Sequence, residues 1–200
     1  MTIDDVIDLS DLLGQMGHIR RVTRLPNGEQ ESDSHHAFSL ALIAYQFCSQ
    51  HCPELDSNKV VLFALAHDLL EIITGDENTL HYDPAAHKLK QQREEKAARE
   101  FDELFQRYPA LKQAMYDYEQ LDTPEAATVF VLDKACTTWT HHHDKAASLR
   151  QLDVTTRAGV ADWATRVRTK LKARLKVMPP QPVLDLYEAS FLKLQDLYDE

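Results

Sequence analysis

The most informative stretch of the sequence is the apolar run VVLFALAHDLLEII at 60–73, in which His67, Asp68 and Glu71 are the polar side chains. A helix that is apolar around its whole circumference belongs in a protein core. Ionisable groups in a core cost on the order of several kcal/mol unless they are paired, protonated or coordinated to a metal. The three residues are neighbours at helical spacing. A buried histidine paired with a carboxylate would explain one of them, but three together, followed by Gly75 and Asp76, favour a metal or catalytic site.

Two other places in the chain could contribute to such a site. His35 and His36 begin an apolar segment, where one inward-facing imidazole would add a nitrogen ligand; alone, a histidine at a helix start is more often solvated. Asp133 lies within the apolar run VFVLDKAC. By itself Asp133 is as apt to pair with Lys134 or Arg157 as to bind a metal ion.

The positions of glycine and proline in the rest of the chain predict helices. Glycine occurs five times, and most of the eight prolines separate apolar, helix-favouring segments. Strand-like alternation is scarce and 18–33 reads as a polar loop, so we predict an all-α fold. Ser34 is the expected N-cap of the second helix. The predicted helices cover about 3–17, 34–50, 57–74, 84–107, a shorter segment from 109, a segment from 124 that carries Asp133, 155–177 and 183–198.

The composition limits the class of protein. The 22 basic and 32 acidic side chains give a formal charge of −10, which argues against binding duplex DNA or RNA. No apolar run approaches the ~20 residues of a bilayer span. The acidic N-terminus lacks a secretory leader, and three cysteines are an odd number for a disulfide framework. We therefore expect a cytoplasmic, single-domain protein that does not bind membranes, with reduced thiols.

Several other patterns favour structure over chemistry. Successive residues on a helix face different directions, so His141, His142 and His143 are predicted to lie on a solvated helix face. Cys48 and Cys52 lack the second pair of a zinc finger and are assigned to core or helix-end positions. The charged run at 88–100 is assigned to a solvated face, and the stripe Phe101, Leu104, Phe105, Tyr108 to core packing.

Taken in order, the segments IRRV (19–22), DSHHAFSLALIA (33–44), ALAHDLLEIITGD (64–76) and VLDKA (131–135) resemble the HD-domain superfamily of metal-dependent phosphohydrolases. The closer resemblance is to the bacterial 5′-deoxynucleotidase group. A histidine followed by aspartate is a weak motif alone. The ordered set, with a glutamate three residues after it and Gly-Asp four residues later, is specific.

The resemblance implies a metal-ligand set of His36, His67, Asp68 and Asp133. In that group the ligand histidine lies five residues before the alanine that here is Ala41, which selects His36 over His35. Two imidazoles and two carboxylates suit one divalent transition metal, namely Mn, Co, Fe, Zn or Ni, and Mg is also compatible.

The resemblance also assigns the remaining catalytic roles. Arg21 would hold the phosphate, because a guanidinium forks onto oxyanions. Glu71 would orient or deprotonate the attacking water, and Asp76 would assist the leaving group or hold the water network, as a catalytic and substrate-binding residue. Val22 stands where the deoxynucleotidase group has a tryptophan associated with deoxyribose selection, which weakens the expectation of strict deoxyribose selectivity.

The expected protein is therefore one HD-type helical bundle over 1–200, with a metal-centre core at about 19–150 and C-terminal helices at 155–198 packed on it. A homo-oligomer is expected, with a dimer favoured.

The expected activity is release of phosphate from (deoxy)nucleoside 5′-monophosphates, which makes the partner a small nucleotide. One alternative is a nucleoside triphosphate triphosphohydrolase, for which Arg20, Arg21 and Arg24 are the obvious phosphate-binding candidates. The other is a non-catalytic helical module that senses metal or nucleotide, against which the presence of Glu71 and Asp76 argues.

Overall fold

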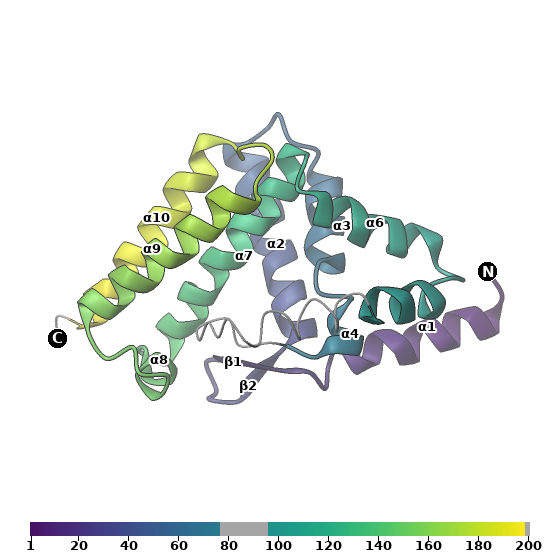
Figure 1. Cartoon of the computed structure of the whole chain (residues 1–200), viewed down its shortest axis with the longest axis horizontal. Helices are drawn as coiled ribbons and strands as arrows, with labels where there is room; N and C mark the ends of the chain where they lie inside the picture. The colour runs from purple at the N-terminus through teal and green to yellow at the C-terminus, as the bar shows by residue number, and fades with distance from the viewer. Residues whose placement is uncertain (77–95, 199–200) are drawn as a thin grey trace.

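The structure is a computed structural model that describes residues 1–76 and 96–198, and it confirms the all-α fold class (Figure 1). Half of the helix predicted at 84–107, residues 84–95, lies outside the described residues, and its described half is helical at 96–104. Within the described residues, no helix has both the length and the apolar character needed to cross a membrane. The other helices are α1 (Ile3–Gln15), α2 (Asp33–His51), α3 (Ser57–Ala66), α4 (Glu71–Thr74), α6 (Pro109–Gln120), α7 (Pro124–His143), α8 (Ala147–Gln151), α9 (Arg157–Arg174) and α10 (Gln181–Gln195), with a 3₁₀ turn η1 (Asp196–Tyr198).

Helix α7 is the central element of the larger core. Its N-terminus is well defined, since the Thr123 side chain accepts a hydrogen bond from the backbone of Ala126 and Pro124 occupies the first turn. Nearly all side chains from Ala126 to Cys136 are buried, because α2, α3 and α10 all pack against this helix (Figure 1). Asp133 is thereby placed in the interior of the molecule.

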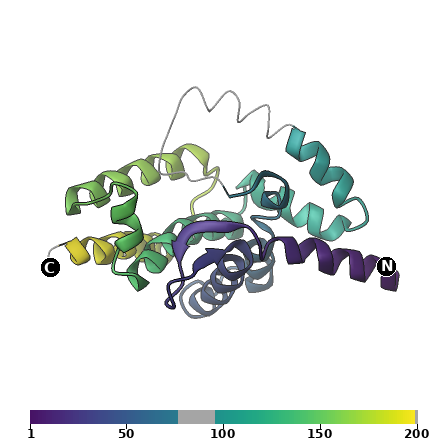
Figure 2. The ribbon, with the colours of Figure 1, turned by 90° about the horizontal axis from the view of Figure 1, so that it is seen from below.

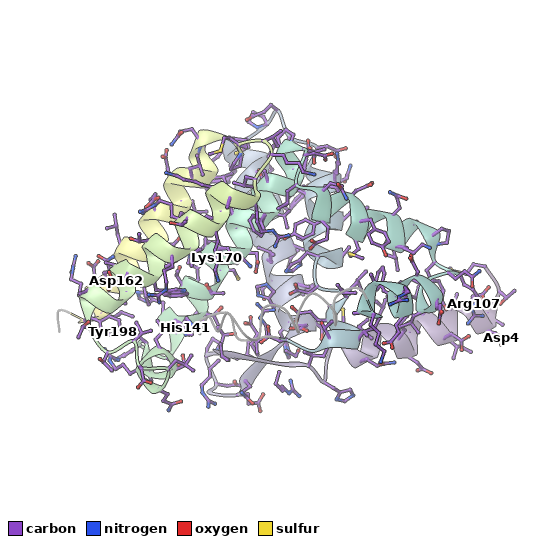
Figure 3. All side chains as sticks on the ribbon, viewed as in Figure 1. Asp4, Arg107, His141, Asp162, Lys170 and Tyr198 are labelled. Atoms are coloured by element: carbon purple, nitrogen blue, oxygen red, sulfur yellow. The ribbon has the colours of Figure 1, made fainter. Side chains whose placement is uncertain are left out.

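A second, smaller core lies where α1 meets the described residues that follow position 95. Leu12 packs in this core with Phe101 and Phe105, whose rings stack at a centroid distance of 4.4 Å. Arg107 forms ion pairs with Asp5 and Asp8 of α1, near the end of the molecule that carries the N-terminus (Figure 3). Figure 2 shows α1 and the C-terminal helices at opposite ends of the molecule. In the predicted core stripe, Phe101, Phe105 and Tyr108 are buried, whereas Leu104 is 42% exposed.

An antiparallel hairpin replaces the polar loop expected at 18–33. Strand β1 (Arg20–Arg24) pairs with β2 (Gln30–Ser32), and Gly28 supplies a positive φ of 86° in the connecting turn. The two strands are joined by side chains as well, because the buried hydroxyl of Thr23 donates to Glu31 at 2.5 Å. Such a short ladder has too few residues for its alternation to be recognised in the sequence.

The helix expected at 57–74 is interrupted at the residues of greatest chemical interest. Helix α3 ends at Ala66, and a turn with hydrogen bonds between residues three apart leads into the four-residue helix α4. In this turn Leu69 N–H donates to the Ala66 carbonyl at 3.2 Å and Glu71 N–H to the Asp68 carbonyl at 2.9 Å. The tighter turn changes the directions of the side chains at 67 and 68 relative to a continuous helix.

Candidate metal centre

Three elements bring two imidazoles and a carboxylate together in the interior. His36 comes from the first turns of α2, His67 from the turn after α3 and Asp133 from the middle of α7. One nitrogen or oxygen of each lies within 4.8 Å of the others, and no side chain of the three is more than 5% exposed. His36 Nε2 lies 3.0 Å from Asp133 Oδ1, and His67 Nε2 lies 3.9 Å from the same oxygen. Three of the four residues predicted as ligands thus form one group.

The hydrogen bonds of His67 are those of a metal ligand. Its Nδ1 lies 2.8 Å from the Ala64 carbonyl, and because a carbonyl only accepts, Nδ1 carries a proton and the neutral ring has its lone pair on Nε2. Nε2 is buried and lies 3.0 Å from Asp68 Oδ2, but it makes no well-aligned hydrogen bond among the described residues. Histidine ligands of metals commonly donate their other N–H to a backbone carbonyl in this way. The buried nitrogen between acidic side chains, without a well-aligned hydrogen bond, fits a divalent cation.

The electrostatics of the group also favour a cation. Burial is the largest single influence and lowers the pKa of His67, but the charges of Asp68 and Asp133, the short contact with Asp68 and the hydrogen bond to the Ala64 carbonyl together raise it. Burial alone would raise the pKa of Asp133, yet the Lys134 ammonium and the bond from His36 hold it well below its ordinary range. Both shifts mean that the interior field stabilises positive charge beside ionised carboxylates.

Asp68, the fourth predicted ligand, lies at the edge of this group. Its Oδ2 is 3.0 Å from His67 Nε2 and 3.0 Å from Arg21 Nη1. Its carboxylate also belongs to a second group, with Asp33 and Glu71, whose oxygens lie within 4.8 Å of one another. Asp68 therefore lies between the two imidazoles and the acidic side chains of Asp33 and Glu71.

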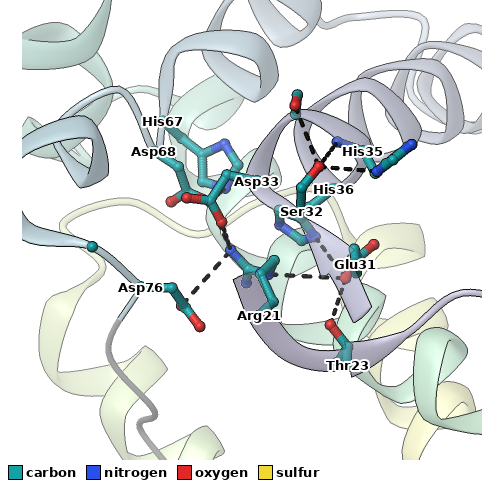
Figure 4. Close-up of polar contacts among 12 residues, drawn as sticks. Arg21, Thr23, Glu31, Ser32, Asp33, His35, His36, His67, Asp68 and Asp76 are labelled. Carbon is teal, nitrogen blue, oxygen red and sulfur yellow. Dashed lines mark hydrogen bonds and ion pairs between the residues drawn. The ribbon is translucent and has the colours of Figure 1, made fainter. Parts of the chain in front are cut away.

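Arg21 is the cation of that acidic set (Figure 4). From strand β1 its guanidinium reaches Asp68 at 3.0 Å, Asp33 at 3.3 Å and Asp76 at 4.0 Å, while Nε lies 3.9 Å from Glu31. The side chain is 12% exposed, and burial would lower its pKa, but the surrounding carboxylates raise it. Arg21 is thus permanently charged and fixed beside the centre.

Glu71 and Asp76 complete the predicted set. Burial, together with the charges of Asp68 and Asp33, raises the pKa of Glu71 to about 10. Its Oε2 is buried without a hydrogen-bond partner among the described residues. Burial is also the first cause of the raised pKa of Asp76. The structure therefore places all seven predicted site residues around one location, although they come from five separate parts of the chain.

Two acidic residues of the site were missed in the sequence. Asp33 is fully buried and Glu31 nearly so, and both contact Arg21. They were missed because 18–33 was assigned to a solvated loop. The N-cap of α2 is Ser32 and not Ser34, so Asp33 is the first helical residue and its side chain points inward.

The two neighbouring histidines at the start of α2 have opposite surroundings. His36 is 1% exposed and belongs to the buried group. His35 is exposed, and its Nδ1 lies 2.9 Å from the hydroxyl of Ser32 (Figure 4). Only His36 is placed to serve as a ligand.

The prediction that 141–143 forms a solvated face is wrong for His141. This side chain is 1% exposed, and its Nδ1 lies 2.8 Å from the hydroxyl of Ser148. Its ring meets that of Trp163 edge-on at 5.9 Å, and burial lowers its pKa to about 4. Helices α8 and α9 fold over this end of α7, a contact that the local pattern does not reveal. His141 lies near α8 (Figure 3), and it follows Asp133 by eight residues of α7, which is roughly 12 Å along the helix axis.

A cavity of about 760 Å³ opens beside the metal centre. Its walls include His67, Asp68, Glu71 and Asp133 on the side of the centre. The other walls are formed by residues of α6, α7 and α9, among them Tyr118, Phe130, Lys134 and Arg174, and by residues between 96 and 100. The volume is that of a site for a small organic molecule such as a nucleotide.

Comparison with known proteins gives a family and several structural relatives. The sequence model of the HD domain matches residues 13–174. No curated protein matches the chain by sequence. The fold is similar to the crystal structure of a predicted metal-dependent phosphohydrolase from Magnetospirillum magnetotacticum MS-1, with a TM-score of 0.70, 19% identity, and coverage of 96% of this chain and 93% of that one.

Two archaeal structures show the same fold. The PH0347 protein from Pyrococcus horikoshii OT3 has a TM-score of 0.59 and 18% identity, covering 98% of this chain and 99% of its own. A conserved hypothetical protein from Pyrococcus furiosus has a TM-score of 0.52 and 22% identity, covering 82% and 99%. At these identities the likeness shows a shared fold.

Proposed function

The chain belongs to the HD domain family, and on that premise we propose that it is a metal-dependent phosphohydrolase that releases phosphate from nucleoside 5′-monophosphates. The observation that carries the proposal is the buried Nε2 of His67, which lies 3.0 Å from Asp68 Oδ2 without a well-aligned hydrogen bond, among acidic side chains at the wall of a cavity. The similar protein from M. magnetotacticum is described as a predicted metal-dependent phosphohydrolase, which agrees with this activity.

Four residues would hold the metal ion. His36, His67 and Asp133 offer their ligand atoms within one small volume, and Asp68 lies beside His67. Two imidazoles and two carboxylates suit Mn, Co, Fe, Zn or Ni, and Mg is also compatible. When bound, the ion would lower the pKa of a water molecule and offset charge on the phosphoryl oxygens.

Arg21 would bind the phosphate group of the substrate. Its guanidinium is held by acidic side chains from four positions, so it presents a fixed charge 3.0 Å from Asp68. A planar guanidinium can donate two parallel hydrogen bonds to a phosphate. Asp76, 4.0 Å from Arg21, would hold the water network or protonate the leaving oxygen, for which a raised pKa is suitable.

Glu71 would take the proton from the attacking water. Its pKa of about 10 means that without a cation the group is a neutral acid, because burial and the nearby carboxylates disfavour a further negative charge. Positive charge at the centre would favour the ionised form. A carboxylate of raised pKa is a stronger base than an ordinary glutamate, so it would hold the transferred proton well.

The cavity supports a small nucleotide as the substrate. Its volume of about 760 Å³ accommodates a nucleoside monophosphate, and the aromatic side chains of Tyr118 and Phe130 are in its walls. Because Val22 replaces the tryptophan of the deoxynucleotidase group, we propose that both ribose and deoxyribose substrates are accepted. Buried free thiols at Cys48, Cys52 and Cys136 agree with the proposal of a reducing, cytoplasmic location.

A metal analysis combined with a phosphate-release screen tests the proposal. The purified chain should contain about one transition-metal ion per molecule and, with Mn, Co, Mg, Zn or Ni, release phosphate from nucleoside 5′-monophosphates. A chain that binds metal and nucleotide but releases no phosphate with any of these ions would instead be a sensing module.

A further inference from the structure

Two basic side chains meet over one aromatic ring in the cavity. The Lys134 Nζ lies 5.4 Å from the centroid of the Phe130 ring, and the Arg174 Cζ lies 4.9 Å from the same centroid. All three side chains line the cavity that also contains Asp133. Lys134 and Phe130 belong to α7, whereas Arg174 is the last residue of α9. Two positive charges beside one ring in the cavity wall would attract an anion more strongly than either charge alone.

Lys134 is positioned to exchange its present partner for a ligand. Its ammonium contacts Asp133 Oδ2 at 2.5 Å, and its side chain is 38% exposed, whereas that of Asp133 is 5% exposed. A metal ion held by Asp133 would take up much of that carboxylate charge. The ammonium of Lys134 would then face the cavity as a cation without full compensation.

Arg174 can also accept an anion at low cost. Its guanidinium lies 3.1 Å from Glu119, in a pair whose side chains are 51% and 43% exposed. Ion pairs this exposed contribute little to stability, so a ligand that displaces Glu119 loses little. The planar guanidinium can hold a phosphate by two hydrogen bonds while it remains stacked over Phe130.

These cations lie at a defined distance from the reacting centre. Phe130 precedes Asp133 by three residues of α7, which is roughly 4.5 Å along the helix axis. Arg21 approaches the centre from β1, on the side of Asp68, whereas Lys134 and Arg174 line the wall formed by α7 and α9. The cavity wall therefore has its own cations: Lys134, which contacts Asp133 directly, and Arg174, which lies over the ring of Phe130.

We propose that Lys134 and Arg174 form a second anion subsite, and that the preferred substrate carries another phosphate group beyond the one that is removed. This inference rests on the proposed phosphohydrolase function and narrows its substrate class. The sequence pointed to Arg20, Arg21 and Arg24 as cations for additional phosphates, but Arg24 donates to the Gly28 carbonyl in the hairpin. The second phosphate could be on the ribose, as in adenosine 3′,5′-bisphosphate, or in a chain, as in adenosine diphosphate.

Steady-state kinetics of the manganese-loaded protein would test the subsite. Adenosine monophosphate, adenosine 3′,5′-bisphosphate and adenosine diphosphate are compared, and one of the latter two should have a kcat/KM at least about tenfold higher than the monophosphate. Arg174→Gln should abolish that preference and leave the monophosphate within about twofold of wild type. Lys134→Gln should also weaken the preference, and Lys172→Gln, an exposed position on the same helix, is the matched control.

The outcomes separate this inference from the proposed function. Equal kcat/KM for all three nucleotides in wild type, or equal losses on all three in Arg174→Gln, would overturn the subsite and leave the phosphohydrolase proposal intact. If wild type releases no phosphate at all, the proposed function fails, and calorimetric titration with the bisphosphate and the diphosphate decides the subsite. Arg174→Gln should then weaken binding of one of them about tenfold, and unchanged affinity for both would overturn the subsite.

Discussion

His67 and His141 are both buried histidines, yet their surroundings are opposite. His67 is 5% exposed and its Nε2 lies among carboxylates without a well-aligned hydrogen bond, while His141 is 1% exposed and bonded to the Ser148 hydroxyl. At His67 the nearby carboxylates and hydrogen bonds together outweigh burial and raise the pKa, whereas burial lowers the pKa of His141 to about 4. Burial of a histidine therefore does not by itself indicate a metal site, whereas buried carboxylates around an imidazole nitrogen favour one.

The two regions also differ in how many charged groups they bury, and so in the desolvation free energy that must be offset. The His67 region collects several carboxylates in the interior, and two of them, Asp33 and Glu71, have a buried oxygen without a hydrogen-bond partner among the described residues. The His141 region buries one neutral imidazole against Trp163. Buried carboxylates cost stability unless cations compensate them; Arg21 supplies one such charge and a bound metal ion would supply more, whereas the neutral His141 needs no such compensation.

The largest expected effect on metal binding and activity comes from substitutions in the carboxylate-rich region around His67. His67→Ala and Asp68→Ala each remove a predicted ligand, so metal binding and phosphate release should both be lost. Metal content by atomic emission and melting temperature with and without Mn²⁺ measure this, and added metal should not rescue the variants. Full metal occupancy in both would show that the assigned centre is wrong.

The second prediction separates chemistry from metal binding. Glu71→Gln keeps the shape and one hydrogen-bonding oxygen but removes the basic carboxylate, so phosphate release should slow at least about 100-fold. Metal content and affinity for nucleoside monophosphate should stay at wild-type values. Loss of the metal in this variant would make Glu71 a ligand and would refute its role as the base.

The third prediction concerns the neutral histidine and the pH dependence of stability. The folded-state pKa of His141 is about 4 and its ordinary value is 6.5. Between these values the unfolded chain binds a proton that the folded chain does not, so stability is lost as pH falls, by about 2 kcal/mol at pH 5.

Urea unfolding at pH 7.5 and pH 5 measures this effect. Wild type should lose more stability than His141→Gln between the two pH values, by about 2 kcal/mol. The variant should keep its metal and its activity at pH 7.5, because His141 lies roughly 12 Å from Asp133 along the axis of α7. Equal acid sensitivity of the two proteins would contradict the lowered pKa.

The smallest expected effect is at His35, which adjoins the centre in sequence but is exposed. His35→Ala should retain activity within about twofold, because it removes a surface contact with Ser32. His36→Ala, one residue further, should abolish activity. The reverse result would move the ligand assignment by one residue and would place the role of Arg21 in question.

Much of the fold was predictable because helices produce recognisable patterns over short stretches of sequence. The helical class, most helix boundaries and the burial of Asp133 follow from apolar periodicity and from proline and glycine positions. The β1–β2 hairpin was not predicted, because three paired residues are too few to show a pattern. The break after Ala66 was also missed, since the run through it is uniformly apolar. The homodimer and the nucleotide partner stay predictions.

The sequence by itself determined which residues could do chemistry. Ionisable groups inside apolar runs can be recognised in the sequence alone, because burying them costs free energy that pairing or a bound metal must offset. Only the tertiary structure decided which groups share a site. Arg21 and Asp68 are 47 residues apart and His36 and Asp133 are 97 apart, and their contacts depend on how helices pack. The same packing buried His141 and carried Arg174 to the ring of Phe130, because long-range contacts arise from the joint burial of separate apolar faces and not from any local pattern.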